Sequence, residues 1–194
     1  YLIVDLPPAK SEWAAEQAGF SDETLVGLTG EGVKVCIVDT GIDLSNPAFS
    51  GVNVEFKDMI GDSSIPVDYG FLAHGTLMSG LLIAQSHQLG MSPNIQLGMV
   101  AALGDDGTGK NTADESDVAQ AINWCIETFS ADIISLSLGG TQSDGMMREG
   151  PSASVTRKAV DMGIFVVAAA GNDGGVGDDG RVSVPSNVAR AISV

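Results

Sequence analysis

The chain has 194 residues, 44% of them hydrophobic and 18% charged, and this composition is typical of a globular domain and excludes a disordered chain. Its 25 acidic residues outnumber its nine basic residues, so the formal net charge at pH 7 is −16. A chain this acidic has no basic patch that would neutralise phosphates, which excludes nucleic acid and anionic membrane surfaces as expected partners.

The first part of the chain, residues 1–24, is predicted to be an N-terminal extension ahead of a single domain over residues 25–194. Residues 11–19 predict a short helix within this extension. The sequence has no basic region followed by an apolar signal core, and its longest apolar run, residues 164–170, is too short to span a bilayer. We therefore expect no membrane insertion.

A run of apolar, mostly β-branched residues at 33–38, VKVCIV, predicts a strand that is buried on both faces. Such strands lie in the middle of parallel sheets. The run ends on Asp39, which Thr40 and Gly41 follow. A carboxylate at the carboxyl end of a central parallel strand lies where open α/β sheets place their chemistry. Taken alone, however, Asp39 is equally well explained as a residue that caps the turn.

Strands and helices alternate along the rest of the domain. Apolar runs predict strands at residues 52–56, 95–103, 133–138 and 164–170, with a last strand beginning at residue 191. Helices are predicted over residues 73–84, from about residue 112 to residue 129, and over a segment that ends at Gly163. This alternation predicts a three-layer α/β fold, in which helices flank a mostly parallel sheet with right-handed crossovers.

Local signals predict how the helices begin. Thr112 and Glu115 have the spacing of a capping box, and Ser152 or Ser154 is expected to cap the next helix. Apolar residues recur at helical spacing after Glu115 and predict one stripe that faces the sheet. The stripe consists of Val118, Ala121, Ile122, Cys125, Ile126 and Phe129.

The chain has two cysteines, Cys36 in the central strand and Cys125 in this stripe. We expect both to be reduced, small core residues, with a disulfide between them as the less favoured alternative.

Four motifs occur in a fixed order: DTGID at 39–43, HGTLMSG at 74–80, SLGG at 137–140 and VVAAAGN at 166–172. Together they resemble the subtilisin-like serine proteases, and the resemblance covers about residues 25–194. It implies a serine endopeptidase that hydrolyses peptide bonds through an acyl-enzyme, on a subtilisin-like fold whose C-terminal part this chain lacks.

The resemblance also implies roles for individual residues. Acyl transfer needs a general base, a carboxylate that orients it, and a hydrogen-bond donor for the developing oxyanion. By resemblance Asp39 orients the base, His74 is the base, and the Asn172 amide binds the oxyanion. Without the motif, His74 would more often be read as a surface or capping histidine. The implied substrate-binding residues are Gly107, Thr108 and Gly109, an edge to which a peptide adds as a strand, and Ser137, Leu138, Gly139, Gly140, Ala169, Ala170 and Gly171, the walls of a side-chain pocket.

The nucleophile of the family is not found. No G-T-S-x-A-type motif follows Asn172, and the similar residues 75–79 belong to the histidine helix, along which Ser79 points away from the site. We therefore expect this chain to be inactive by itself and to need a C-terminal segment or chain that carries the serine. The alternative is a catalytically inactive subtilisin-like module that binds peptides or protein partners.

Further segments of the sequence are candidate binding sites for phosphate or for calcium. Residues 104–110, GDDGTGK, match a phosphate-binding loop, but Asn111 follows where a Ser or Thr would hold magnesium. Acidic residues at 173–180 suggest a calcium site, for which a solvated loop is the favoured alternative. The usual family calcium site is not expected, because Ala48 stands where a ligand is needed and the loop at 85–92 is short. No cofactor is expected to be required.

The sequence also bears on the preferred substrate side chain and on the cellular location of the protein. The small residues of the pocket predict space for a large apolar side chain, whereas Asp173 at its rim would admit a basic one. Most members of the family are exported, so the resemblance favours secretion, although nothing in the sequence excludes the cytoplasm.

Overall fold

The computed structural model describes residues 19, 27–85, 90–140, 150–172, 174 and 180–194. The helix predicted at residues 11–19 therefore lies outside the described residues, apart from Gly19. Six parallel strands form one sheet in the order β2-β3-β1-β6-β7-β8. Their bounds are β1 Lys34–Asp39, β2 Val54–Asp58, β3 Gln96–Ala101, β6 Ile133–Leu136, β7 Phe165–Ala168 and β8 Ile192–Ser193.

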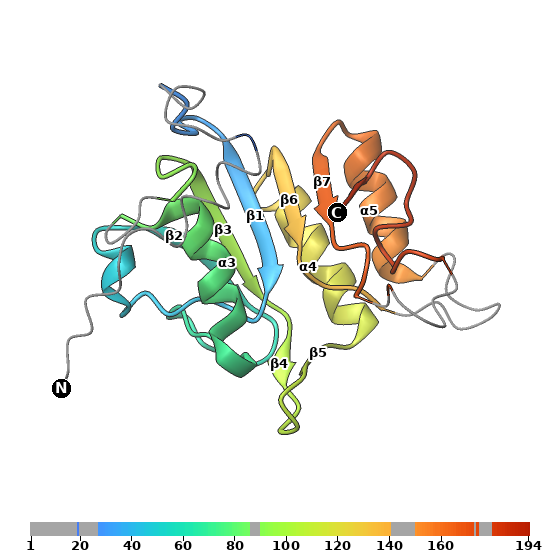
Figure 1. Ribbon diagram of the computed structural model, residues 1–194, viewed down its shortest axis with the longest axis horizontal. Coiled ribbons are helices and arrows are strands. Elements are labelled where there is room, and N and C mark those ends of the chain that lie inside the picture. Colours follow the sequence, from blue (N-terminus) through green and yellow to red (C-terminus); the bar gives the residue numbers. More distant parts are fainter. Residues whose placement is uncertain (1–18, 20–26, 86–89, 141–149, 173, 175–179) are drawn as a thin grey trace.

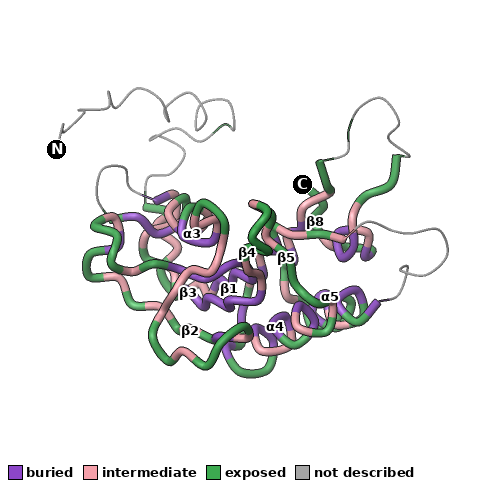
Figure 2. The backbone as a smooth tube through the Cα atoms, turned by 90° about the horizontal axis from the view of Figure 1, so that it is seen from below, coloured by how far each residue is buried: buried purple, intermediate pink, exposed green. Residues whose placement is uncertain are grey.

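Helices lie on both sides of this sheet. Helix α3 (His74–Ile83) covers one face, whereas α4 (Glu115–Glu127) and α5 (Pro151–Asp161) cover the other, as Figures 1 and 2 show. Two short 3-10 helices, η2 (Pro47–Phe49) and η3 (Phe71–Ala73), precede α3. The predicted three-layer, mostly parallel α/β fold is confirmed. Within the described parts of the chain, no helix has both the length and the apolar character needed to cross a membrane.

Strand β1 lies in the interior of the sheet, paired with β3 on one side and β6 on the other. Its side chains alternate between two apolar clusters. Val35 and Ile37 belong to the cluster beneath α3, and Cys36 and Val38 belong to the cluster beneath α4 and α5. The prediction of a strand that is buried on both faces is confirmed. Each of the valine and isoleucine side chains contributes about 1.5–3 kcal/mol to folding on full burial.

The two cysteines were expected to be reduced, and this prediction was wrong. Cys36 of β1 and Cys125 of α4 form a disulfide that joins residues 89 positions apart in the sequence. Both residues are fully buried, and their Cα atoms lie 5.8 Å apart, a usual separation for a disulfide. The bond fixes α4 to the central strand only three residues before Asp39.

The start of α4 also differs from the prediction. The N-cap is Asp114, which makes no capping side-chain bond, so the predicted capping box of Thr112 and Glu115 does not form. Glu115 instead accepts hydrogen bonds from Ser152 at the start of α5, from Oγ at 2.5 Å and from the backbone N–H at 3.1 Å. Its carboxylate thus satisfies a free N–H group at the N-terminus of a different helix. The N-cap of α5 is Gly150, and neither Ser152 nor Ser154 occupies that position.

We predict that replacing both cysteines, Cys36→Ala with Cys125→Ala, lowers the free energy of unfolding by about 2–4 kcal/mol, because the unfolded chain regains the freedom that the cross-link removes. Urea unfolding followed by tryptophan fluorescence measures the change. A reducing agent should lower the stability of the unsubstituted protein toward that of the variant and leave the variant unaffected. Equal stability of the two proteins without reductant would contradict the disulfide.

Candidate active site

Asp39 and His74 come together at the carboxyl edge of the sheet. Asp39 is the last residue of β1, and His74 is the first residue of α3. His74 Nδ1 lies 2.8 Å from one carboxylate oxygen of Asp39 and 3.0 Å from the other. The structure thus pairs two residues that are 35 positions apart in the sequence.

Two glycines allow this approach. A Cβ on Gly75 would lie 2.2 Å from the carbonyl oxygen of Gly41 and 3.2 Å from Asp39 Oδ1. A Cβ on Gly41, whose φ is +111°, would lie 1.9 Å from the carbonyl oxygen of Val67. A larger residue at position 75 would therefore push the start of α3 away from the end of β1, and one at position 41 would displace the segment at Val67 and Asp68.

Asp39 and His74 differ in their exposure to solvent, and this difference affects the pKa of Asp39. Asp39 is only 2% exposed, and this burial raises the pKa of its carboxyl group above the ordinary value. Hydrogen bonds from His74 and from the Thr40 N–H, the latter 2.7 Å long, lower the pKa of Asp39 and offset part of that effect. The His74 side chain is 36% exposed. Because Nδ1 faces Asp39, Nε2 is the ring nitrogen that remains for a reacting group.

A pocket of about 340 Å³ lies at the carboxyl ends of the neighbouring strands β6 and β7. Six of the predicted site residues line it, namely Ser137, Leu138, Gly139, Ala169, Gly171 and Asn172. The oxyanion candidate Asn172 therefore lies in the wall of the candidate substrate pocket. Of the other two predicted wall residues, Gly140 pairs with Val184, and the Ala170 carbonyl accepts a 2.7 Å hydrogen bond from the Ser183 N–H. These two residues hold a later segment of the chain against the pocket.

That later segment adds Ser183, a lining residue that sequence reasoning missed. A Cβ on Gly139 would lie 2.6 Å from Ser183 Cβ, and a Cβ on Gly171 would lie 2.8 Å from Ser183 Oγ. Ser183 thus fills space that the two glycines leave open. No local pattern identifies it, because its position depends on pairing with Gly140 and Ala170.

The third predicted group, Gly107, Thr108 and Gly109, lies at the tip of a hairpin. Its strands are β4 (Gly104–Asp105) and β5 (Asn111–Thr112), which pair antiparallel. The three N–H groups of the tip donate to the carboxylates of Asp105 and Asp106. Strand addition by a peptide through these N–H groups would require them to change partners, and the role of residues 107–109 as a substrate edge stays a prediction.

The same hairpin argues against a phosphate-binding loop at residues 104–110. A phosphate cradle joins a strand to a helix and points free backbone N–H groups at the anion. Here the segment joins two antiparallel strands, and its tip amides already bind carboxylates.

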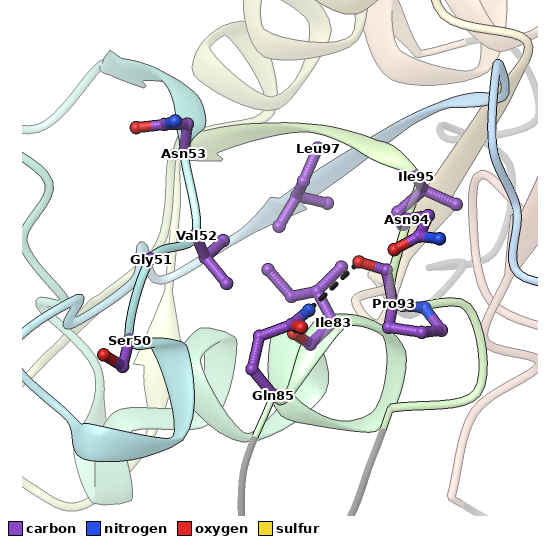
Figure 3. Close-up of a pocket in the computed structure, with 10 residues that line it drawn as sticks. All are labelled: Ser50, Gly51, Val52, Asn53, Ile83, Gln85, Pro93, Asn94, Ile95 and Leu97. Carbon is purple, nitrogen blue, oxygen red and sulfur yellow. Dashed lines mark hydrogen bonds between the residues drawn. The ribbon is translucent and has the colours of Figure 1, made fainter.

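Hydrogen bonds join the loops at the opposite end of the sheet. The Gln85 N–H donates to the Ala48 carbonyl at 2.7 Å, and the Gln85 side chain donates to the Pro93 carbonyl. A cavity of about 250 Å³ beside them is lined by uncharged residues, as Figure 3 shows. Among the residues described, no three His, Cys, Asp or Glu side chains are grouped as metal ligands. The suggested calcium site at residues 173–180 lies mostly outside the described residues.

Ser79 is held inside helix α3, as the sequence suggested. It is fully buried, and its Oγ donates to the Gly75 carbonyl at 2.8 Å. This hydroxyl is therefore buried against the backbone of α3, in a hydrogen bond to its own helix.

Comparisons with known proteins show which family the chain belongs to. The model of the Subtilase family matches residues 30–194. Subtilisin amylosacchariticus of Bacillus subtilis subsp. amylosacchariticus is 34% identical over 172 residues, which are 87% of this chain and 42% of that protein. Subtilisin-like protease 1 of Arthroderma gypseum is 30% identical over 180 residues, or 90% of this chain and 34% of that protein.

Among solved structures, Sphericase superposes with a TM-score of 0.67 at 28% identity, covering 85% of this chain and 53% of that chain. The chain thus spans about a third to a half of the length of these relatives. The family model covers most of the chain, and both the fold and the order of the motifs agree with it. The chain belongs to the subtilase family.

Proposed function

We propose that this chain supplies the aspartate, the histidine and the oxyanion-binding asparagine of a serine endopeptidase. The observation that carries the proposal is the hydrogen bond between Asp39 and His74 at the sheet edge that also holds the pocket of Asn172. Membership of the subtilase family and relatives that are named subtilisins support it.

In the proposed mechanism, the Asp39 carboxylate accepts the hydrogen bond from Nδ1–H of His74 and fixes the ring in one tautomer. Nε2 then takes the proton from a serine hydroxyl as its oxygen attacks the carbonyl carbon of the peptide. His74 returns this proton to the departing amine, which leaves an acyl-enzyme. Water attacks the acyl group by the same proton transfers and regenerates the serine.

Asn172 and the pocket act on the substrate in this scheme. The Asn172 side-chain N–H donates to the oxygen that becomes negatively charged during attack. The side chain before the scissile bond enters the pocket at Leu138, Gly139 and Gly171, where a large apolar group would bury its surface. The proposed chemistry needs no metal or cofactor, because side chains supply the base, the nucleophile and the oxyanion donor.

The serine is proposed to come from a segment outside residues 1–194. On the face of the sheet that α3 covers only in part, no described helix lies over β6 and β7 (Figure 1). Leu77 and Leu81 of α3 and Phe165 of β7 are exposed. Exposed apolar side chains such as these suit contact with a further segment, which in this proposal carries the serine.

The alternative of an inactive peptide-binding module has less support. An inactive module has no need for a carboxylate that is buried at 2% exposure against a histidine, since a buried charge lowers stability unless it is paired. We also propose that the protein folds in an oxidising compartment, such as the cell exterior. The support is the disulfide between Cys36 and Cys125, because such bonds are rare in reducing cytosol.

The peptidase proposal is tested on the whole protein that carries this chain, with chromogenic peptides that have Phe, Leu or Arg before the scissile bond. We expect cleavage after Phe and Leu to exceed cleavage after Arg. Asn172→Ala should lower kcat by about 10²–10³-fold with little change in KM, the range typical of losing the corresponding donor in subtilisin. Asn53→Ala, in the cavity of Figure 3, is the control and should retain full activity. Undiminished kcat in Asn172→Ala would contradict the oxyanion role.

The raised pKa of Asp39 also predicts how stability varies with pH. The folded protein holds the carboxyl proton more tightly than the unfolded chain, so Asp39 favours folding below its ordinary pKa of 3.8. That contribution is lost as the pH rises through the raised pKa of the folded state. Asp39→Asn should therefore be more stable than the unsubstituted protein at pH 7, with a difference that disappears as the pH falls below 3.8.

Urea unfolding across this pH range measures the effect of Asp39→Asn. Asp62→Asn is the matched control, since Asp62 is an exposed aspartate whose replacement removes the same charge. Lower stability of Asp39→Asn at pH 7 than of the unsubstituted protein would contradict the argument.

A further inference from the structure

A third carboxylate, that of Asp68, joins the two segments that carry Asp39 and His74. Asp68 Oδ1 accepts hydrogen bonds from Thr40 Oγ1 at 2.7 Å and from the Gly70 N–H at 2.9 Å. Asp68 Oδ2 accepts hydrogen bonds from Thr76 Oγ1 at 2.5 Å and from the Thr76 N–H at 2.9 Å. One oxygen therefore binds the residue after Asp39, and the other binds the first turn of α3.

The hydroxyl groups of Thr40 and Thr76 also connect the end of β1 with the start of α3. Thr40 Oγ1, which donates to Asp68, accepts a hydrogen bond from the Gly75 N–H at 2.8 Å. Thr76 Oγ1 accepts a hydrogen bond from the Asp43 N–H at 2.9 Å. The end of β1 and the start of α3 are thus connected in both directions through hydroxyl groups that Asp68 orients.

The turn between Asp68 and His74 has an unfavourable backbone conformation. Leu72 (φ 56°, ψ 23°) and Ala73 (φ 49°, ψ 52°) both lie in the left-handed region, which residues other than glycine rarely adopt. Such conformations persist only where the surrounding contacts over-determine them. Asp68 holds both ends of this turn, through Gly70 at its start and Thr76 beyond its end.

This position calls for hydrogen-bond acceptors at both side-chain oxygens. All four partners of Asp68 donate hydrogen bonds, and a carboxylate is an acceptor at both oxygens. An asparagine of the same shape would direct its NH2 group at one pair of these donors. That pair would lose its acceptor, and the segment that it belongs to would be released.

We propose that Asp68 is a positioning residue that holds the His74 ring against Asp39, because it binds the end of β1 and the start of α3 at once. Its importance for catalysis rests on the proposed peptidase function. Its effect on the His74 ring does not, because the ring position can be measured in the resting protein without substrate.

The test uses Asp68→Asn, with Asp62→Asn as the matched control in the preceding loop. In the resting protein labelled with ¹⁵N-histidine, the Nδ1–H proton of His74 gives a far-downfield NMR signal, assigned with His74→Gln. We expect Asp68→Asn to broaden this signal or to raise its exchange rate with water by about tenfold or more, the effect of losing a charge-assisted hydrogen bond. Asp62→Asn should leave the signal unchanged. A folded Asp68→Asn protein with an unchanged signal and exchange rate would overturn the proposal.

If Asp68→Asn does not fold, Thr40 variants decide the question. Thr40→Val keeps the shape of the buried side chain and removes its hydroxyl, whereas Thr40→Ser keeps the hydroxyl. Loss of the signal in Thr40→Val with retention in Thr40→Ser supports the proposal, and an intact signal in both contradicts it. In whole protein with peptidase activity, Asp68→Asn should lower kcat more than it raises KM. Failure of the peptidase proposal would instead appear as absent activity in the unsubstituted protein with the His74 signal intact.

Discussion

The carboxylate of Asp39 lies buried at the end of the central strand, and its hydrogen bond from His74 is the interaction on which the site depends. Burial raises the pKa of this group, so the charged form is retained only with partners that donate to it. His74 Nδ1 and the Thr40 N–H are those partners. The fold must therefore hold the start of α3 against the end of β1 at hydrogen-bond distance. A carboxylate that is costly to bury and paired with a histidine is the arrangement that general base chemistry needs.

Much of the fold serves to keep β1 in place. The strand has neighbours on both sides and apolar clusters on both faces, and the disulfide from Cys36 to Cys125 fixes it to α4. The close approach of α3 depends on Gly75, which lacks the Cβ atom that would separate it from the end of β1, and Gly41 allows the segment at Val67 to pack equally closely. The pocket for the substrate side chain is held by other contacts than the Asp39–His74 pair. The pocket walls come from the residues that follow β6 and β7 and from the segment around Ser183, which three backbone hydrogen bonds to Gly140 and Ala170 hold in position.

Sequence reasoning worked where the physical signal is local or periodic. The β-branched run of β1 and the helical stripe of α4 predicted buried elements, because burial leaves a pattern in neighbouring residues. It failed where the partner is distant in the sequence. Glu115 has the spacing of a local cap, yet it binds Ser152, 37 residues away, and nothing near Cys36 indicates that Cys125 is within bonding distance. Ser183 and Asp68 were missed for the same reason, since each acquires its role through tertiary contacts. Asp39, His74 and Asn172 were found through motif order, and their individual contexts were ambiguous.

The central claim is that His74 activates a serine that lies outside residues 1–194. Labelling of the native whole protein with a fluorophosphonate, followed by peptide mapping under denaturing conditions, tests it most directly. The claim predicts one labelled serine in a segment beyond this chain, with labelling lost in His74→Gln. Label on a serine within residues 1–194, or equal labelling in His74→Gln, would contradict it.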